Sequence, residues 1–105
     1  MGFSQMIQLL QTKNKGKIVF VNSESFYVAI GKDAVVLNEI LDFKVTCLKQ
    51  EICKVGFPIV ALEKYTELLS QKNYSYIVYY FNRQNEELEI LLDYICTKFN
   101  EKSKK

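Results

Sequence analysis

Apolar residues along the chain follow two spacings, one typical of helices and one typical of strands. Apolar positions three and four residues apart predict four helices, at residues 3 to about 12, 33 to about 42, 62–69 and 84–99. Runs of β-branched and aromatic residues predict five strands, at residues 17–21, 25–30, 43–48, 52–57 and 74–81. This order of helices and strands predicts an α/β domain with one mixed β-sheet.

Polar residues between these segments predict where the chain turns. Asn22-Ser23-Glu24 separates the first two strands by a tight connection, and Lys49-Gln50-Glu51 separates the next two as a hairpin. Asp33 is placed to cap the second helix. Pro58 ends the fourth strand because it has no backbone donor to offer a neighbouring strand.

Two later segments and the chain length complete the predicted architecture. Residues 74–81 are apolar or aromatic on both faces, which favours a central strand with helices above and below it. Residues 84–99 show the clearest helical spacing, and a lysine-rich tail that is expected to fray follows from about residue 100. With 105 residues, of which 49% are hydrophobic, we expect a single domain over residues 1–105, with one mixed sheet of about five strands packed with about four helices.

Charge is unevenly distributed although the net charge is only +2. Lys13, Lys15 and Lys17 lie near the start without an acidic neighbour, and a second group of lysines lies in the tail. Acidic residues concentrate in the predicted last helix, at Glu86, Glu87, Glu89 and Asp93. A nucleic acid would therefore meet the two ends of the chain more readily than that helix.

Three cysteines, Cys47, Cys53 and Cys96, form no Cys-x-x-Cys pair and are odd in number. This pattern predicts neither a disulfide framework nor a zinc site, and it favours buried free thiols in a reducing cytoplasm. No apolar run approaches the ~18 residues of a membrane span, and no charged-then-apolar leader precedes the first helix. We therefore expect a cytoplasmic protein without membrane contact.

Catalytic chemistry has little support in the sequence. The chain contains no histidine, which excludes the commonest general base, the Ser-His and Cys-His nucleophile pairs and most zinc or iron sites. Neither a phosphate-binding loop nor a dinucleotide motif is present. The glutamates from residue 86 onward are typical of a solvated first helical turn. We expect no enzyme activity, no metal, no cofactor and no small-molecule substrate.

Several short motifs occur in an order that resembles a known family. The first group is Ile18-Val19-Phe20-Val21, then Ser25-Phe26-Tyr27-Val28, then Asp33-Ala34. The second group is Val55-Gly56-Phe57-Pro58, a helix containing Tyr65, and the apolar run at residues 76–81. Together, over residues 7–81, they resemble the N-terminal mismatch-recognition domain, domain I, of the DNA repair protein MutS, which has a mixed α/β fold and contacts the mispaired base.

The resemblance implies a function in nucleic-acid binding and assigns roles to individual positions. In the family, the Phe of a Phe-x-Glu motif stacks at the mismatch and the Glu hydrogen-bonds the displaced base. Phe26 matches the Phe, whereas Val28 matches the Glu and cannot form a side-chain hydrogen bond. We therefore expect a stand-alone, non-catalytic accessory domain that binds double-stranded DNA weakly and without mismatch specificity. Phosphate contacts from Lys13, Lys15 and Lys17 and a partner protein are expected to support this binding.

An alternative function is a protein-protein interaction module that kept the fold and lost DNA contact. The orientation of the second strand decides between them, because Phe26, Val28 and Ile30 form one face and Tyr27 and Ala29 form the other. If Phe26 and Val28 face outward, they form an apolar patch that favours a protein partner.

Overall fold

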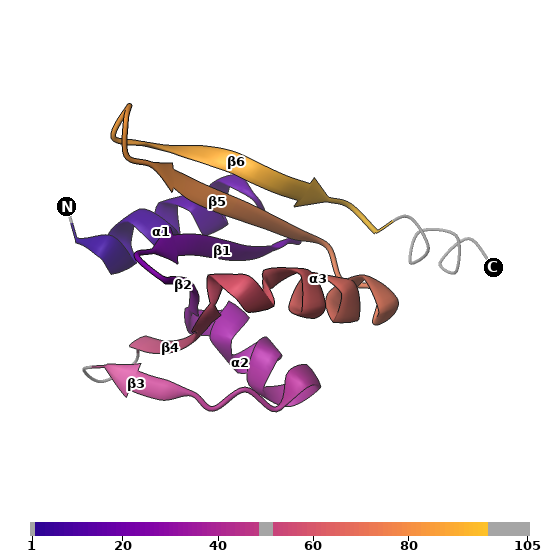
Figure 1. Cartoon of the computed structure of the whole chain (residues 1–105). Coiled ribbons are helices and arrows are strands. Elements are labelled where there is room, and N and C mark those ends of the chain that lie inside the picture. Colours follow the sequence, from indigo (N-terminus) through magenta and orange to yellow (C-terminus); the bar gives the residue numbers. More distant parts are fainter. Residues whose placement is uncertain (1, 49–51, 97–105) are drawn as a thin grey trace.

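The computed structural model describes residues 2–48 and 52–96, which form one six-stranded mixed sheet and three α-helices (Figure 1). In chain order the elements are α1 (Phe3–Lys13), β1 (Ile18–Ser23), β2 (Phe26–Ile30), α2 (Gly31–Leu41), β3 (Thr46–Leu48), β4 (Ile52–Pro58), the short 3-10 helix η1 (Ile59–Ala61), α3 (Leu62–Gln71), β5 (Tyr76–Asn82) and β6 (Glu87–Tyr94). The strand order is β3-β4-β2-β1-β5-β6, with β1 and β5 parallel and the other neighbours antiparallel. The α/β class, the mixed sheet, the first three helices and both early strand pairs are confirmed.

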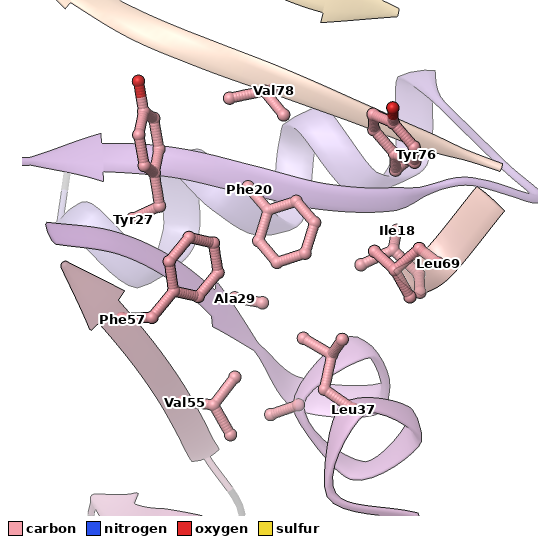
Figure 2. Close-up of a cluster of buried hydrophobic side chains, with 11 residues drawn as sticks. Ile18, Phe20, Tyr27, Ala29, Leu37, Val55, Phe57, Leu69, Tyr76 and Val78 are labelled. Carbon is pink, nitrogen blue, oxygen red and sulfur yellow. The ribbon is translucent and has the colours of Figure 1, made fainter. Parts of the chain in front are cut away.

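Helices cover both faces of the sheet, and each face has its own cluster of buried apolar residues. On one face, Ile7 of α1 packs with Val19, Val21, Val28, Ile30, Ile77 and Tyr79. On the other face, Ala34, Leu37 and Leu69 of α2 and α3 pack with Ile18, Phe20, Tyr27, Ala29, Val55, Phe57, Tyr76 and Val78 (Figure 2). Because alternate strand residues point to opposite faces, β1, β2 and β5 are apolar on both sides. The segment near residues 74–81 is confirmed as an interior strand, β5, with helices on both faces of the sheet, although β2 and β1 form the middle of the sheet and β5 lies next to the edge strand β6.

The predicted helix over residues 84–99 is wrong, because β6 pairs with β5 along its whole length. A turn at residues 83–86 joins the two strands, and the Oδ1 atom of Asn82 accepts hydrogen bonds from the backbone N–H groups of Gln84 and Asn85 at 2.9 and 3.4 Å. An asparagine in this position is a turn signal. The described residues thus contain six strands and three α-helices, in place of about five strands and about four helices.

A β-bulge explains why the β6 sequence imitates a helix. The register shifts between Val78 and Tyr79, which pair with Leu92 and Ile90, so Leu91 has no partner in β5. The extra residue interrupts strand alternation, and apolar residues then recur at spacings that also fit a helix. Residues 97–99 of the predicted helix, the lysine-rich tail and the predicted hairpin connection Lys49-Gln50-Glu51 lie outside the described residues.

Asp33 does not cap α2 as predicted, but it ties three elements together. The helix begins at Gly31, and buried Asp33 lies in its first turn. Its Oδ2 atom accepts hydrogen bonds from the backbone N–H of Val19 at 3.1 Å and from Nε2 of Gln11 at 2.9 Å. Burial raises the pKa of the Asp33 carboxyl, while these hydrogen bonds and nearby Lys32 act in the opposite direction. Asp33 therefore joins α1, β1 and α2 at a buried position.

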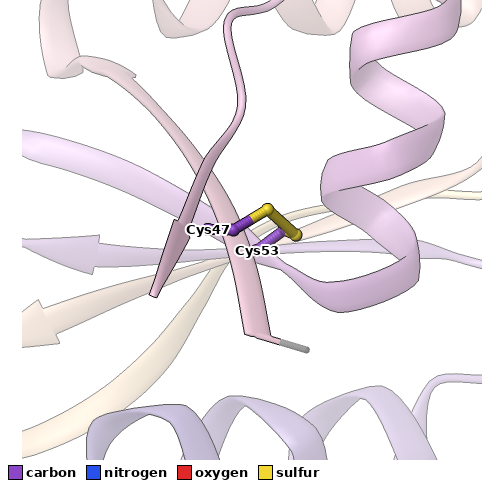
Figure 3. The surroundings of a disulfide bond; sticks show 2 residues. All are labelled: Cys47 and Cys53. Carbon is purple, nitrogen blue, oxygen red and sulfur yellow. A yellow bond between two sulfur atoms is a disulfide. The ribbon is translucent and has the colours of Figure 1, made fainter. Parts of the chain in front are cut away.

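Two cysteines differ from the expectation of free thiols. Cys47 and Cys53 are register partners in β3 and β4 and form a disulfide (Figure 3). The prediction failed because a spacing of six residues does not show which strand residues lie opposite each other. Cys96 is free and buried, as expected.

Candidate nucleic-acid interface

Phe26 lies at the end of the β1–β2 hairpin, as the first residue of β2. The turn contains Glu24, whose φ of 54° lies in the left-handed region. Asn22 supports the turn, because its Nδ2 group donates to the backbone oxygens of Glu24 and Phe26 at 3.0 and 3.1 Å. The backbone N–H of Ile59 donates to the oxygen of Ser25 at 2.9 Å, which ties the turn to η1. A braced hairpin thus presents the Phe26 side chain, which is 49% exposed.

A hollow of about 430 Å³ lies beside Phe26. Val28 and Gly56, which face each other across β2 and β4, line it together with Lys54 and the residues of the turn. A Cβ atom on Gly56 would lie 3.8 Å from Cγ2 of Val28, so a larger residue there would occupy the hollow. The absence of a side chain at Gly56 therefore helps to keep space open next to the exposed ring.

Val28 does not share the exposure of Phe26. Its side chain is only 7% exposed and packs in the cluster under α1, where Val21 and Ile30 are also buried. Tyr27 and Ala29 are buried on the opposite face. Both faces of β2 therefore pack inward, and the apolar patch of Phe26 with Val28 is not formed. Val28 forms part of the floor of the hollow instead of a protruding contact.

The three lysines near the start of the chain lie away from Phe26. Lys13 ends α1, Lys15 follows it, and Lys17 immediately precedes β1, whereas Phe26 pairs with the last residue of that strand. At about 3.3 Å per residue, the length of β1 separates these two ends of the sheet by roughly 17 Å. Lys17 also forms an ion pair with Asp93, with 2.7 Å between Nζ and Oδ1. The structure therefore does not bring the predicted lysines together with the aromatic residue.

Three residues that the sequence analysis missed line the hollow beside Phe26 or the neighbouring groove. Lys54 lines the hollow, and Arg83 lies on the turn between β5 and β6, beside a second and larger groove. Phe81 also lines that groove and is 37% exposed. Sequence alone carried little signal for this group, because strand register and the order of the strands decide which side chains become neighbours.

No metal chemistry is indicated at this end of the sheet. Within residues 2–48 and 52–96, no group of three His, Cys, Asp or Glu side chains is arranged to hold a metal ion. The contacts available at Phe26 are aromatic stacking, apolar packing and single charged groups.

Among the described helices, none has the length and apolar character needed to cross a membrane.

The fold defines the class of this protein as a small mixed α/β domain with an exposed aromatic residue on a hairpin. The family model for MutS domain I matches residues 2–99, and the chain therefore belongs to the MutS domain I family. The match extends beyond the motifs at residues 7–81 and includes β6. The architecture is thus that of a mismatch-recognition domain, whose role in the family is to contact DNA. None of the curated proteins compared with the chain matches it.

Proposed function

We propose that this chain is a non-catalytic accessory domain that binds nucleic acid, above all duplex DNA, in the cytoplasm. The observation that supports this function best is Phe26, which occupies the stacking position of the family motif and is 49% exposed at a braced hairpin end. A phenylalanine inserted between base pairs unstacks them and bends a duplex without needing a polar neighbour. Phe26 would act as such a wedge.

The affinity of this wedge alone is small. Stacking contributes roughly 1–3 kcal/mol per base, whereas even a millimolar complex requires about 4 kcal/mol. The remaining free energy would come from phosphate contacts and from a partner protein that also holds the duplex. We propose Lys13 and Lys15 as phosphate contacts at one end of the sheet and Lys54 near Phe26, because Lys17 is engaged with Asp93.

Mismatch specificity is not expected, because Val28 occupies the position of the base-reading glutamate. A valine side chain neither donates nor accepts a hydrogen bond. We expect equal affinity for a homoduplex and for a duplex with one mismatch.

Fluorescence anisotropy with labelled homoduplex, mismatched, single-stranded and RNA probes tests this function. We expect duplex binding that weakens as salt rises. Phe26→Ala should weaken duplex binding about 5- to 150-fold, which corresponds to the loss of roughly 1–3 kcal/mol of stacking. Phe26→Trp should retain binding, because tryptophan also stacks. Phe26 is half exposed, so these variants should fold, and circular dichroism checks that they do. Absence of binding to every probe at about 100 μM protein, the weak limit of non-specific DNA complexes, would contradict the proposal.

The alternative of a protein-interaction module that uses Phe26 together with Val28 loses the surface on which it depended, because Val28 is buried.

A further inference from the structure

A groove of about 890 Å³ lies at the end of the sheet that carries Phe26. It is enclosed by the first turn of α1, the β1–β2 turn and the turn at residues 83–86, which all lie at the same end of the molecule in Figure 1. We call it the acidic groove. Its volume is within the range of about 300–1,000 Å³ that is typical of ligand sites.

The floor of the acidic groove is apolar. Phe3 and Met6 from α1 lie opposite Phe81 and Leu88, which are register partners in β5 and β6. Phe3 is 42% and Phe81 is 37% exposed, so two aromatic side chains remain accessible to a ligand. Removing such surface from water is favourable. The floor therefore favours a ligand with a large apolar side chain.

The rim of the acidic groove is negatively charged. Glu24, Glu86 and Glu87 line it against a single cation, Arg83. In the part of the chain that the structure describes, Lys17 with Asp93 is the one side-chain ion pair, so these four charges are not neutralised by ion pairs. A rim with a net charge of about −2 repels phosphate groups and attracts lysine and arginine.

We propose that the acidic groove binds a peptide segment of a partner protein, in which a large apolar side chain is flanked by lysine or arginine. The apolar side chain would occupy the floor between Phe3 and Phe81, and the flanking cations would lie against the glutamates of the rim. Basic segments of this kind are common in proteins that bind nucleic acid. A partner of that class would also supply the duplex affinity that the Phe26 wedge lacks. The peptide site itself does not depend on the proposed DNA binding.

Selection of short random peptides displayed on phage, followed by anisotropy titration of the enriched peptides, tests the proposal. Enriched sequences should combine an aromatic or leucine residue with lysine or arginine. Phe81→Ser should abolish binding, whereas Val60→Ser, which alters an apolar residue that is 89% exposed elsewhere, should not change it. Glu86→Lys/Glu87→Lys should weaken binding about tenfold at low salt. Glu63→Lys/Glu67→Lys makes the same charge change on exposed residues of α3 and should leave binding unchanged.

Other outcomes would overturn the proposal. Enrichment of acidic peptides, no enrichment at all, or equal loss of affinity with the α3 control would exclude a basic ligand in this groove. Self-association in sedimentation experiments that Phe81→Ser removes would identify a second copy of the chain as the occupant instead. Phe26→Ala should weaken DNA binding but leave peptide binding intact, so failure of one function can be told from failure of the other.

Discussion

At the scale of single residues, Asp33 shows how a buried charge is accommodated in this fold. The carboxylate accepts two hydrogen bonds, from Val19 and Gln11, and these connect α2 to β1 and α1. A buried donor that loses its acceptor costs about 1–3 kcal/mol. The residue is therefore expected to stabilise the fold through its hydrogen bonds, although its negative charge is unfavourable in this place.

Substitutions at Asp33 separate the effect of its hydrogen bonds from the effect of its negative charge. Asp33→Ala should lower the free energy of unfolding by about 1–3 kcal/mol. It leaves the buried backbone N–H of Val19 without its acceptor, and it removes one of the two hydrogen bonds of the Gln11 amide, which also donates to the backbone oxygen of Ile30. Asp33→Asn should cost less, because its amide oxygen can still accept. Urea denaturation, followed by circular dichroism, measures both changes.

The contribution of Asp33 to folding stability should depend on pH in a defined direction. Burial raises the pKa of Asp33 above its ordinary value of 3.8. The stabilisation linked to its proton is therefore fully present below about pH 4 and is lost as the pH rises through the raised pKa. We expect wild type to lose stability relative to Asp33→Asn over this interval. A stability difference that is independent of pH would show that the carboxyl does not titrate differently in the folded state.

Val28 is the second residue with a testable consequence. Val28→Glu restores the family's glutamate beside the hollow that Lys54 also lines. We expect the ratio of mismatch to homoduplex affinity to rise several-fold, because the new carboxylate can accept a hydrogen bond from a base. Placing a carboxylate against the apolar neighbours of Val28 should cost more folding free energy than the roughly 1–3 kcal/mol of a neutral polar group left without a partner. Anisotropy with paired probes measures the ratio, and Val28→Met provides a control of similar length without a polar atom. A folded Val28→Glu variant with equal affinity for both probes would contradict this role.

At the scale of elements, the β3–β4 hairpin depends on a covalent link as well as on strand pairing. The Cys47–Cys53 disulfide closes a loop with a sequence separation of six residues. In the chain-entropy account, a loop this short contributes about 2 kcal/mol of stability. β3 spans three residues at the edge of the sheet, so little pairing is available to replace the link.

Reduction should therefore destabilise the protein by about 2 kcal/mol. Thermal denaturation should show a lower midpoint for wild type in reductant, and no such effect of reductant on Cys47→Ser/Cys53→Ser. Thiol titration of the unfolded, non-reduced protein should detect Cys96 alone, and detection of all three cysteines would show that the link is absent. In a reducing cytoplasm the pair would be held as thiols, and the hairpin would then have the stability of the double variant.

At the scale of the whole molecule, the distribution of charge determines how a duplex can lie on it. Lys13 and Lys15 are exposed at the end of the sheet opposite Phe26. The strand β1, which separates these lysines from Phe26, spans roughly 17 Å. Successive phosphates of one DNA strand are spaced by about 3.4 Å along the axis. A duplex wedged by Phe26 would therefore reach these lysines about five phosphates away.

Replacing the two lysines should change the salt dependence of DNA binding while the wedge residue Phe26 stays in place. Lys13→Gln/Lys15→Gln should reduce the slope of log affinity against log salt by about 0.9 for each phosphate contact removed. Lys64→Gln/Lys72→Gln removes two exposed lysines on the α3 side and should leave the slope unchanged. Equal slopes for wild type and both variants would show that Lys13 and Lys15 do not contact phosphate.

The sequence by itself determined the α/β class, the three helices α1, α2 and α3, the two early strand pairs and the two-sided interior strand β5. These features follow from local spacing of apolar residues and from turn residues, which act over a few positions. The MutS resemblance also came from short motifs in order, and the family match over residues 2–99 confirms it.

Tertiary structure alone decided the rest. Pairing with β5 made residues 87–94 a strand, although their apolar spacing also fits a helix. Strand register placed Cys47 opposite Cys53 and buried Val28, and antiparallel pairing of β1 with β2 put the first lysines far from Phe26. The acidic groove likewise combines residues from three distant parts of the chain. These outcomes depend on which strands become neighbours. The free energy of contacts between strands that are distant in the chain decides this, and the spacing of residues within a single segment carries no information on such contacts.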